Sequence, residues 1–178
     1  MSDPTPTIGE PRDEFSLPAH GERSLRDLVD AADFDAVHFF IEEGLEEDAI
    51  AVAPAAEDVT FALLPYEHPD NAVNSESFDL IEDAGYEPAT FRDLLAFAIE
   101  RPGVQLEYDV VALGTLRTRR VYDEREGETV WDQRDLDKSI CQWATGLSDM
   151  KQTRTLVPVE IYLDKVLRKD TLLLVRRS

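Results

Sequence analysis

One loop of the chain places a histidine beside two carboxylates, in the order Glu67-His68-Pro69-Asp70. Histidine titrates near neutral pH, so a histidine beside carboxylates can exchange protons with a substrate or hold a cation. A solvent-exposed turn rich in proline and aspartate has the same composition, and that interpretation requires no chemistry. Glu67, His68 and Asp70 are therefore the candidate residues of a small hydrolase or metal-dependent enzyme, the third of three functional hypotheses.

The other nucleophiles and bases form no recognisable pattern. His20 lies in a proline-rich segment, His38 lies in an apolar run, and Cys141 has no histidine in its half of the chain. The sequence contains no Walker A, Rossmann, HExxH or GxSxG motif and no pair of cysteines spaced to bind a metal. It thus favours a protein that is not an enzyme, and it predicts no metal site and no cofactor.

Acidic residues outnumber basic ones 38 to 18, which gives a formal net charge of −20. Self-repulsion of such a charge destabilises a compact domain in dilute buffer, whereas in 1 M salt the screening length falls to about 3 Å. Because 43% of the residues are hydrophobic, the chain can form a packed core, and disorder does not explain its acidity. The composition predicts a protein of a salt-accumulating halophile, located in the cytoplasm or in a virion.

The two halves of the chain differ in charge. Residues 1–100 contain 4 basic and 25 acidic residues, a net charge of −21, and residues 101–178 contain 14 basic and 13 acidic residues, a net charge of +1. Such asymmetry marks a surface that faces a partner, or it arises because basic residues pair with acidic ones across the fold. Both interpretations stay open at this point.

Six basic residues of the second half are candidates for partner binding. They are Arg117, Arg119, Arg120, Lys165, Arg168 and Lys169. Arg117 and Arg119 are predicted to share one face of a strand, because side chains alternate along a strand with a period of two. Arginines in this arrangement suit a protein partner, a second copy of the chain, or the phosphates of a nucleic acid. Because nucleic-acid binding weakens steeply as salt rises, it is the second hypothesis, through the Arg117–Arg120 strand.

The leading hypothesis is a non-catalytic interaction or structural module of a halophile, or of its virus or mobile element. The first 21 residues contain four prolines and few large apolar groups, which predicts an extended arm followed by one domain over residues 22–178. We expect this arm and the less acidic second half to bind a protein partner. No signal peptide and no apolar run of membrane-spanning length is present, so no membrane contact is predicted.

Apolar spacing and capping residues predict helices over 24–33, 75–84, 90–101 and 136–146. β-Branched and aromatic runs predict strands over 36–41, 49–53, 59–64, 106–113, 116–122, 129–131, 156–163 and 172–175. Residues 124–127 are predicted to form the turn of a hairpin. The fold class that follows is α+β, with a mostly antiparallel sheet and two to four helices.

One segment resembles known sequences. It runs from Gly85-Tyr86-Glu87-Pro88-Ala89-Thr90 through Asp93–Ala98 and Gln105 to Val110-Val111-Ala112-Leu113-Gly114. This pattern resembles a GYRPAT, ELLAFA, LQ, IVALGS segment found in a group of small uncharacterised bacterial proteins. The resemblance covers about 30 of the 178 residues, and it implies a shared local fold and no reaction.

Overall fold

The computed structural model describes residues 5–18, 20, 23–46, 59–68, 73, 75–120, 123–125, 128–130, 140–150, 153–160 and 170–177. Four helices lie in these ranges: α1 (Leu25–Ala32), α2 (Phe39–Glu46), α3 (Ser75–Asp83) and α4 (Phe91–Glu100), with a short 3-10 helix at Val104–Leu106. The predicted strand over 49–53 lies outside the described residues.

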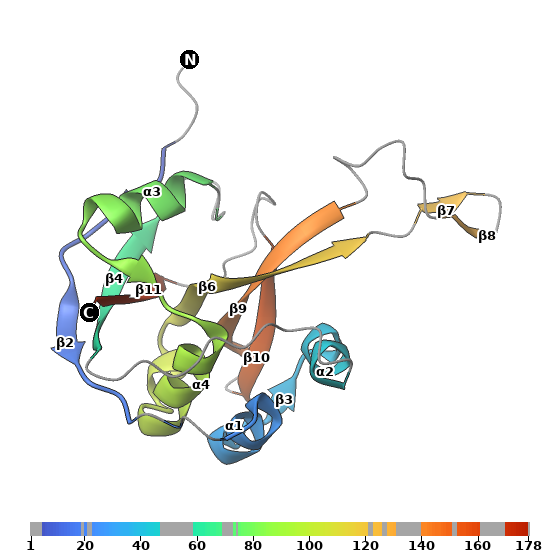
Figure 1. Cartoon of the computed structure of the whole chain (residues 1–178), viewed down its shortest axis with the longest axis horizontal. Helices are drawn as coiled ribbons and strands as arrows, with labels where there is room; N and C mark the ends of the chain where they lie inside the picture. The colour runs from blue at the N-terminus through green and yellow to red at the C-terminus, as the bar shows by residue number, and fades with distance from the viewer. Residues whose placement is uncertain are drawn as a thin grey trace.

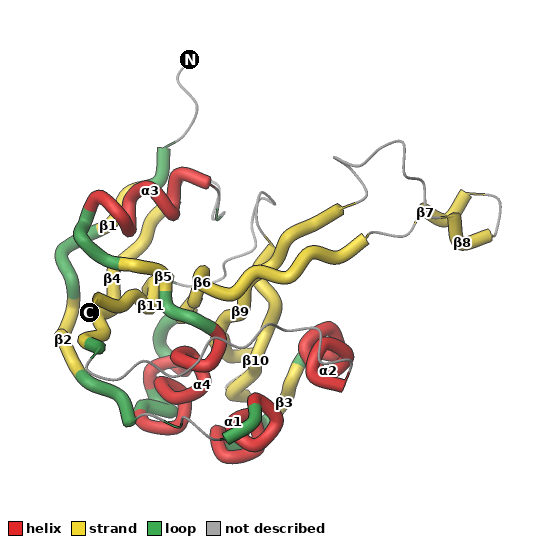
Figure 2. Tube along the Cα trace, in the orientation of Figure 1, coloured by secondary structure: helices red, strands yellow, loops and turns green. Residues whose placement is uncertain are grey.

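Nine of the described strands form one sheet, in the order β1-β4-β11-β6-β9-β10-β3, with β2 also beside β4 and β5 beside β11 (Figures 1 and 2). Their bounds are β1 (Thr7–Ile8), β2 (Arg12–Phe15), β3 (Ala36–Val37), β4 (Thr60–Glu67), β5 (Glu87–Pro88), β6 (Asp109–Arg120), β9 (Ile140–Met150), β10 (Thr153–Glu160) and β11 (Thr171–Arg177). Among the pairings of these described strands, only β11–β6 and β10–β3 are parallel. The α+β class and the mostly antiparallel sheet are therefore confirmed.

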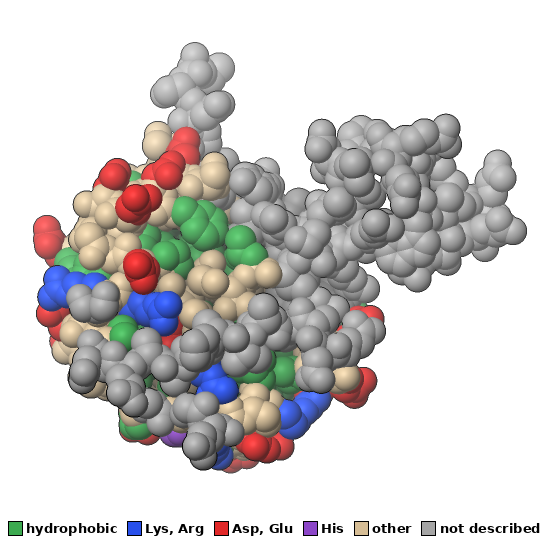
Figure 3. All heavy atoms as spheres, in the orientation of Figure 1, with side chains coloured by type: hydrophobic (Ala, Val, Ile, Leu, Met, Phe, Trp, Pro, Cys, Tyr) green, Lys and Arg blue, Asp and Glu red, His purple; other side chains and the backbone are tan. Residues whose placement is uncertain are grey.

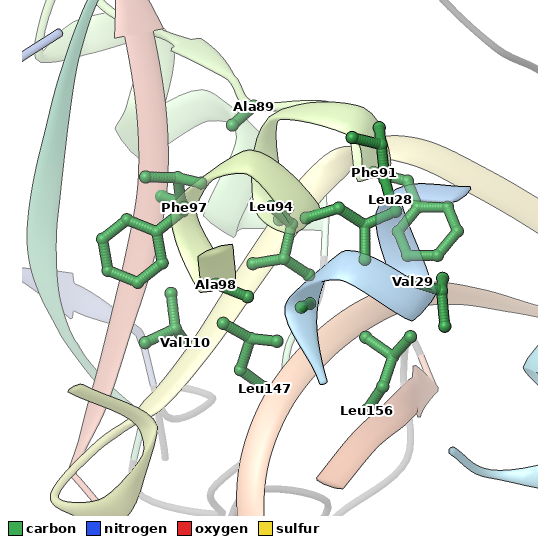
Figure 4. Packing of buried hydrophobic residues seen from close by; sticks show 14 of the residues in the cluster. Leu28, Val29, Ala89, Phe91, Leu94, Phe97, Ala98, Val110, Leu147 and Leu156 are labelled. Carbon is green, nitrogen blue, oxygen red and sulfur yellow. The ribbon is translucent and has the colours of Figure 1, made fainter. Parts of the chain in front are cut away.

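Alternate residues of the central strands enter two different clusters of buried side chains. On β11, Leu172 and Leu174 belong to one cluster, and Leu173 and Val175 belong to the other. Because successive side chains of a strand point to opposite faces of the sheet, both faces are buried. Helices α1 and α4 cover the first face, where their leucines and phenylalanines meet the side chains of β6, β9 and β10 (Figure 4). Helix α3 packs on the second face through Ile81.

Local signals set one end of each of three helices as predicted. Thr90 accepts a hydrogen bond from the Asp93 N–H, and the Asp93 carboxylate accepts one from the Thr90 N–H, which is a complete capping box at the start of α4. Ser24 caps α1 through the N–H of Asp27. Gly85 follows α3 with φ at +85°, a left-handed conformation that favours glycine.

The predicted strand over 36–41 is wrong beyond Val37, because helix α2 begins at Phe39. The His38 N–H donates to the Leu156 carbonyl at 2.9 Å, and the His38 carbonyl accepts from the Ile41 N–H at 2.9 Å. His38 is therefore the residue at which the strand ends and the helix starts. A short apolar run does not distinguish strand from helix by itself, and here Ile41 and Leu45 bury one helical face.

The predicted helix over 136–146 is also wrong, because residues 140–150 form strand β9. This strand lies between β6 and β10 and pairs with both. Residues 144–148 are all buried, so the strand shows no alternation of polar and apolar residues. A side chain at Gly146 would approach Val159 to 2.8 Å, which explains a glycine at this position in the sheet.

The two strands predicted over 106–113 and 116–122 are one strand, β6. Its register against β9 shifts between Ala112 and Arg117, where four residues of β6 lie opposite Ala144 alone. This bulge contains Gly114 and bends the strand. The hairpin turn predicted over 124–127 is wrong in its first two residues, because β7 (Asp123–Arg125) pairs antiparallel with β8 (Glu128–Val130) and includes Glu124 and Arg125. Residues 126 and 127 lie outside the described residues.

The described part of the N-terminal arm lies along the edge of the sheet. Strands β1 and β2 both pair with β4. The Phe15 ring lies 6.1 Å from the Phe61 ring and 5.8 Å from the Phe97 ring, and the Arg101 guanidinium lies 4.1 Å above it. The arm is therefore extended, as predicted, but the part that the structure describes packs against its own domain.

Candidate functional site: the ribbon of β6 and β9

Beyond the bulge, strands β6 and β9 continue as a two-stranded ribbon that leaves the body of the sheet (Figure 1). We define the ribbon as Arg117–Arg120 of β6 paired with Ile140–Trp143 of β9. Strand β11 pairs with β6 only as far as Val111, and β10 pairs with β9 only as far as Trp143. Within the described parts of the chain, the ribbon strands beyond those points pair only with each other. A two-stranded ribbon by itself is marginally stable in water.

The base of the ribbon is fixed to the start of helix α4. The Gly114 N–H donates to the Ala89 carbonyl at 2.7 Å, and the Phe91 N–H donates to the Thr115 hydroxyl at 3.0 Å. A side chain at Gly114 would approach the Ala89 oxygen to 2.5 Å, so only glycine allows this contact. Leu116, the last residue of the bulge, is 40% exposed. The core thus sets the direction in which the ribbon leaves the sheet.

The ribbon is free of acidic residues in a strongly acidic chain. No aspartate or glutamate occurs over residues 110–120 or 140–148. In the register of the two strands, Arg117 lies opposite Trp143, Arg119 opposite Cys141, and Arg120 opposite Ile140. Each of the three arginines is therefore paired with an uncharged position of β9.

Two basic residues at the end of β11 pair with acidic residues of the first half of the chain. Arg177 forms an ion pair with Glu14, and Arg176 lies 3.5 Å from a carboxylate oxygen of Asp93. For these residues, pairing across the fold explains part of the charge asymmetry. The arginines of the ribbon have no such carboxylate in their register partners.

Two further arginines bind backbone carbonyls. The Arg154 guanidinium donates to the Ala32 carbonyl at 2.9 Å, the Asp33 carbonyl at 3.1 Å, the Pro102 carbonyl at 3.1 Å and the Ala98 carbonyl at 3.3 Å. It therefore joins the C-terminal ends of α1 and α4, where carbonyls lack helical partners and a positive charge is favourable.

The second of these arginines, Arg92, is buried and donates to the carbonyls of His20 and Arg23, which fixes the segment that leads into α1. Sequence reasoning did not single out Arg92 or Arg154, because a partner that is a distant carbonyl leaves no pattern in the sequence.

The predicted acid-base loop is described only in part. Glu67 is exposed at the end of β4, His68 is half-buried, and Asp70 lies outside the described residues. Just before them, burial raises the pKa of Tyr66 above its usual value of 10.0, and its hydroxyl hydrogen-bonds to Ser77 at 2.9 Å. Among the described residues, no three His, Cys, Asp or Glu side chains are placed to share a metal ion.

Three of the six predicted partner-binding residues, Lys165, Arg168 and Lys169, also lie outside the described residues. The structure therefore brings together Arg117, Arg119 and Arg120 on the ribbon, and the role of the other three stays a prediction.

Four residues of the segment 85–114 have local structural roles. Thr90 caps α4, Gly85 ends α3, and Gly114 allows the close approach to Ala89. The Gln105 side chain is buried and donates to the Ser148 carbonyl at 2.8 Å, which ties the 3-10 helix to β9. Of these residues only Thr90 and Gly114 lie at the base of the ribbon, and none of the four has a titratable side chain.

Among the described residues, no helix is long and apolar enough to cross a membrane. Comparison of the chain with protein families, curated proteins and solved structures gives no match.

Proposed function

We propose that this protein is a non-catalytic interaction module that binds a protein partner through the ribbon of β6 and β9. The observation that carries the proposal is the acid-free composition of the ribbon, with three arginines opposite uncharged positions. Interfaces are enriched in arginine and tryptophan and depleted in aspartate and glutamate. In a chain of net charge −20, the ribbon is the part that approaches another acidic protein with the least repulsion.

A habitat of concentrated salt accounts for the acidic residues on the rest of the described surface. None of the four described helices has a basic residue in its last turn, and acidic residues occupy these turns: Asp30, Glu43, Glu46, Glu82, Asp83 and Glu100. Negative charge at a helix C-terminus is unfavourable in dilute solution, by about 0.3–1 kcal/mol each, and salt screens it. Figure 3 shows acidic side chains around the rim of the described surface. We infer a halophilic protein of the cytoplasm or of a virion.

Salt also favours a protein partner over a nucleic acid. Binding to phosphates depends on the release of counterions and falls steeply as the salt concentration rises, whereas apolar contacts and main-chain hydrogen bonds do not depend on charge. Trp143, Ile140 and Leu116 place apolar residue types on and beside the ribbon. Such a surface suits a partner in molar KCl better than a surface of arginines alone.

The test compares two triple variants that lose the same charge. Arg117→Gln, Arg119→Gln and Arg120→Gln alter the ribbon, and Arg12→Gln, Arg23→Gln and Arg26→Gln alter the first half of the chain. Each variant is expressed in a halophile and its complexes are sized by light scattering in molar KCl, with and without nuclease. We expect a nuclease-resistant complex for the wild type and the first-half variant, and a free monomer for the ribbon variant. A free wild-type monomer, or a complex that nuclease destroys, contradicts the proposal, and the second result supports the nucleic-acid alternative.

A further inference from the structure

We propose that the partner contributes an acidic β-strand, which adds to the outer edge of β6 along Arg117–Arg120. This inference rests on the proposed function and specifies the chemistry of the partner. It follows from a comparison of the strand edges of the sheet. An edge whose N–H and C=O groups are unpaired is a template for pairing with another chain.

The edge of the sheet beside β4 is covered. Strands β1 and β2 pair with β4 along most of its length, and the Gly9 N–H between them donates to the Pro65 carbonyl at 2.9 Å. Asp13 takes a left-handed conformation with φ at +41°, which interrupts the outer side of β2. This edge therefore offers a partner only short, irregular strands.

The edge of the sheet beside β10 is blocked by a proline. The Leu156 carbonyl accepts from the His38 N–H, so the polar groups of Leu156 face β3. Polar groups of a strand alternate between its two sides, so those of Pro158 face the same way. Proline has no N–H to donate, and it is typical of strand edges that resist pairing. Strand β3 pairs with only two residues of β10.

The outer edge of β6 along residues 117–120 is neither covered by another described strand nor interrupted by a proline. Residues 117–120 contain no proline, and they keep a regular register with β9. Within the described residues, no strand pairs with this edge beyond Val111. A strand that pairs here extends the ribbon to three strands, which removes its marginal stability.

The residue types of β6 select the partner by charge. Arg117 and Arg119 occupy alternate positions of β6, with Arg120 next to Arg119, and alternate positions of a strand share one face. Opposite charges in directly facing positions of neighbouring strands stabilise a pairing by roughly 0.2–1 kcal/mol each, and like charges destabilise it. A strand with carboxylates at alternate positions matches Arg117 and Arg119. The β6 strand of a second copy would instead place arginine opposite arginine, so we favour an acidic strand of a different protein.

The test uses the full chain in molar KCl and three short synthetic peptides. The first alternates threonine with glutamate, the second alternates threonine with lysine, and the third is the glutamate peptide with a central proline. Binding is measured by fluorescence anisotropy and by the amide shifts of residues 117–120. The expected order is glutamate peptide tightest, with the proline peptide roughly tenfold weaker because it loses main-chain pairing. The lysine peptide should be only about threefold weaker, because molar salt screens part of each charge contact.

A charge-reversed protein separates strand pairing from simple attraction. In the double variant Arg117→Glu and Arg119→Glu, whose fold is checked by circular dichroism and urea midpoint, the lysine peptide should bind better than the glutamate peptide. Equal binding of the proline peptide and the glutamate peptide overturns the inference, because it shows attraction without main-chain pairing. The glutamate peptide could fail to bind while the triple Arg→Gln variant of the ribbon still loses its cellular complex. In that case the inference of an acidic partner strand is wrong, and the proposed function stands.

Discussion

The contribution of Arg154 to stability tests how this acidic fold joins its helices to its sheet. Its guanidinium donates to four carbonyls at 2.9 to 3.3 Å and lies 5.3 Å from the centre of the Phe34 ring. A hydrogen bond from a charged donor is worth about 1.5–3 kcal/mol. Because Arg154 is only half-buried and water can replace part of each bond, we take about a third of that value per carbonyl. Replacement by alanine should therefore cost about 3 kcal/mol.

Lysine at this position separates charge from geometry. Arg154→Lys keeps a positive charge near the C-terminal ends of α1 and α4, which retains roughly 0.3–1 kcal/mol per helix. A single ammonium cannot reach carbonyls on both helices, because it lacks the forked shape of the guanidinium. We expect Arg154→Lys to lose about 2 kcal/mol.

The assay is urea unfolding in molar KCl, with stability taken from the midpoint and the slope. Arg26→Ala is the matched control, since Arg26 forms a half-exposed ion pair with Glu42 at 2.8 Å and its loss should cost less than about 1 kcal/mol. The reasoning is refuted if Arg154→Ala costs no more than Arg26→Ala, or if Arg154→Lys is as stable as the wild type.

Three further predictions concern backbone space, salt and pH. Gly114→Ala should destabilise the fold by about 2 kcal/mol, while Gly103→Ala, whose added methyl meets nothing within 4 Å, should change the free energy of unfolding by less than about 0.5 kcal/mol. Glu82→Lys, in the last turn of α3, should raise stability by about 0.5–1 kcal/mol in dilute buffer and not in molar salt; an equal gain in both would argue against charge as the cause. Because burial raises the pKa of Tyr66 above 10.0, the folded state keeps a proton that the unfolded state loses, so stability should fall as pH rises past about 10. Tyr66→Phe should make that fall shallower, and an unchanged slope would show that Tyr66 does not contribute to it.

Elements fixed by local signals could be predicted from the sequence. The capping box of α4 and the left-handed Gly85 after α3 both depend on residues within a few positions of each other. The apolar residues that predicted α4 are buried, but burial covers all of residues 91–98 and includes Arg92 and Asp93. The fold class followed from these elements and from the strands that they separate.

Elements fixed by distant partners could not be predicted. Ile140, Trp143 and Leu147 recur at helical spacing, yet pairing with β6 on one side and β10 on the other makes this segment a strand. Burial of both faces removes the alternation that marks a strand. The end of the strand at His38 could not be predicted for the same reason, because its N–H donates to the Leu156 carbonyl, more than a hundred positions away in the sequence.

The candidate site was partly visible in the sequence. Arg117, Arg119 and Arg120 stand out by type and spacing, and the absence of nearby acidic residues can be read directly. The identity of the opposite strand could not be read, because it depends on the register that brings Ile140–Trp143 alongside. Only that register shows that the three arginines are paired with uncharged positions of β9.

The most direct measurement of the central claim is cross-linking inside the native cell. A photoreactive amino acid is placed at Thr118 on the ribbon, or at Asp79 on the exposed face of α3, and the products are identified after illumination. If the ribbon is the binding surface, position 118 gives one dominant protein adduct that disappears with Arg117→Glu and Arg119→Glu, and position 79 gives none. Adducts of equal yield at both positions, or adducts at position 118 that contain nucleic acid alone, would contradict the claim that the ribbon binds a protein partner.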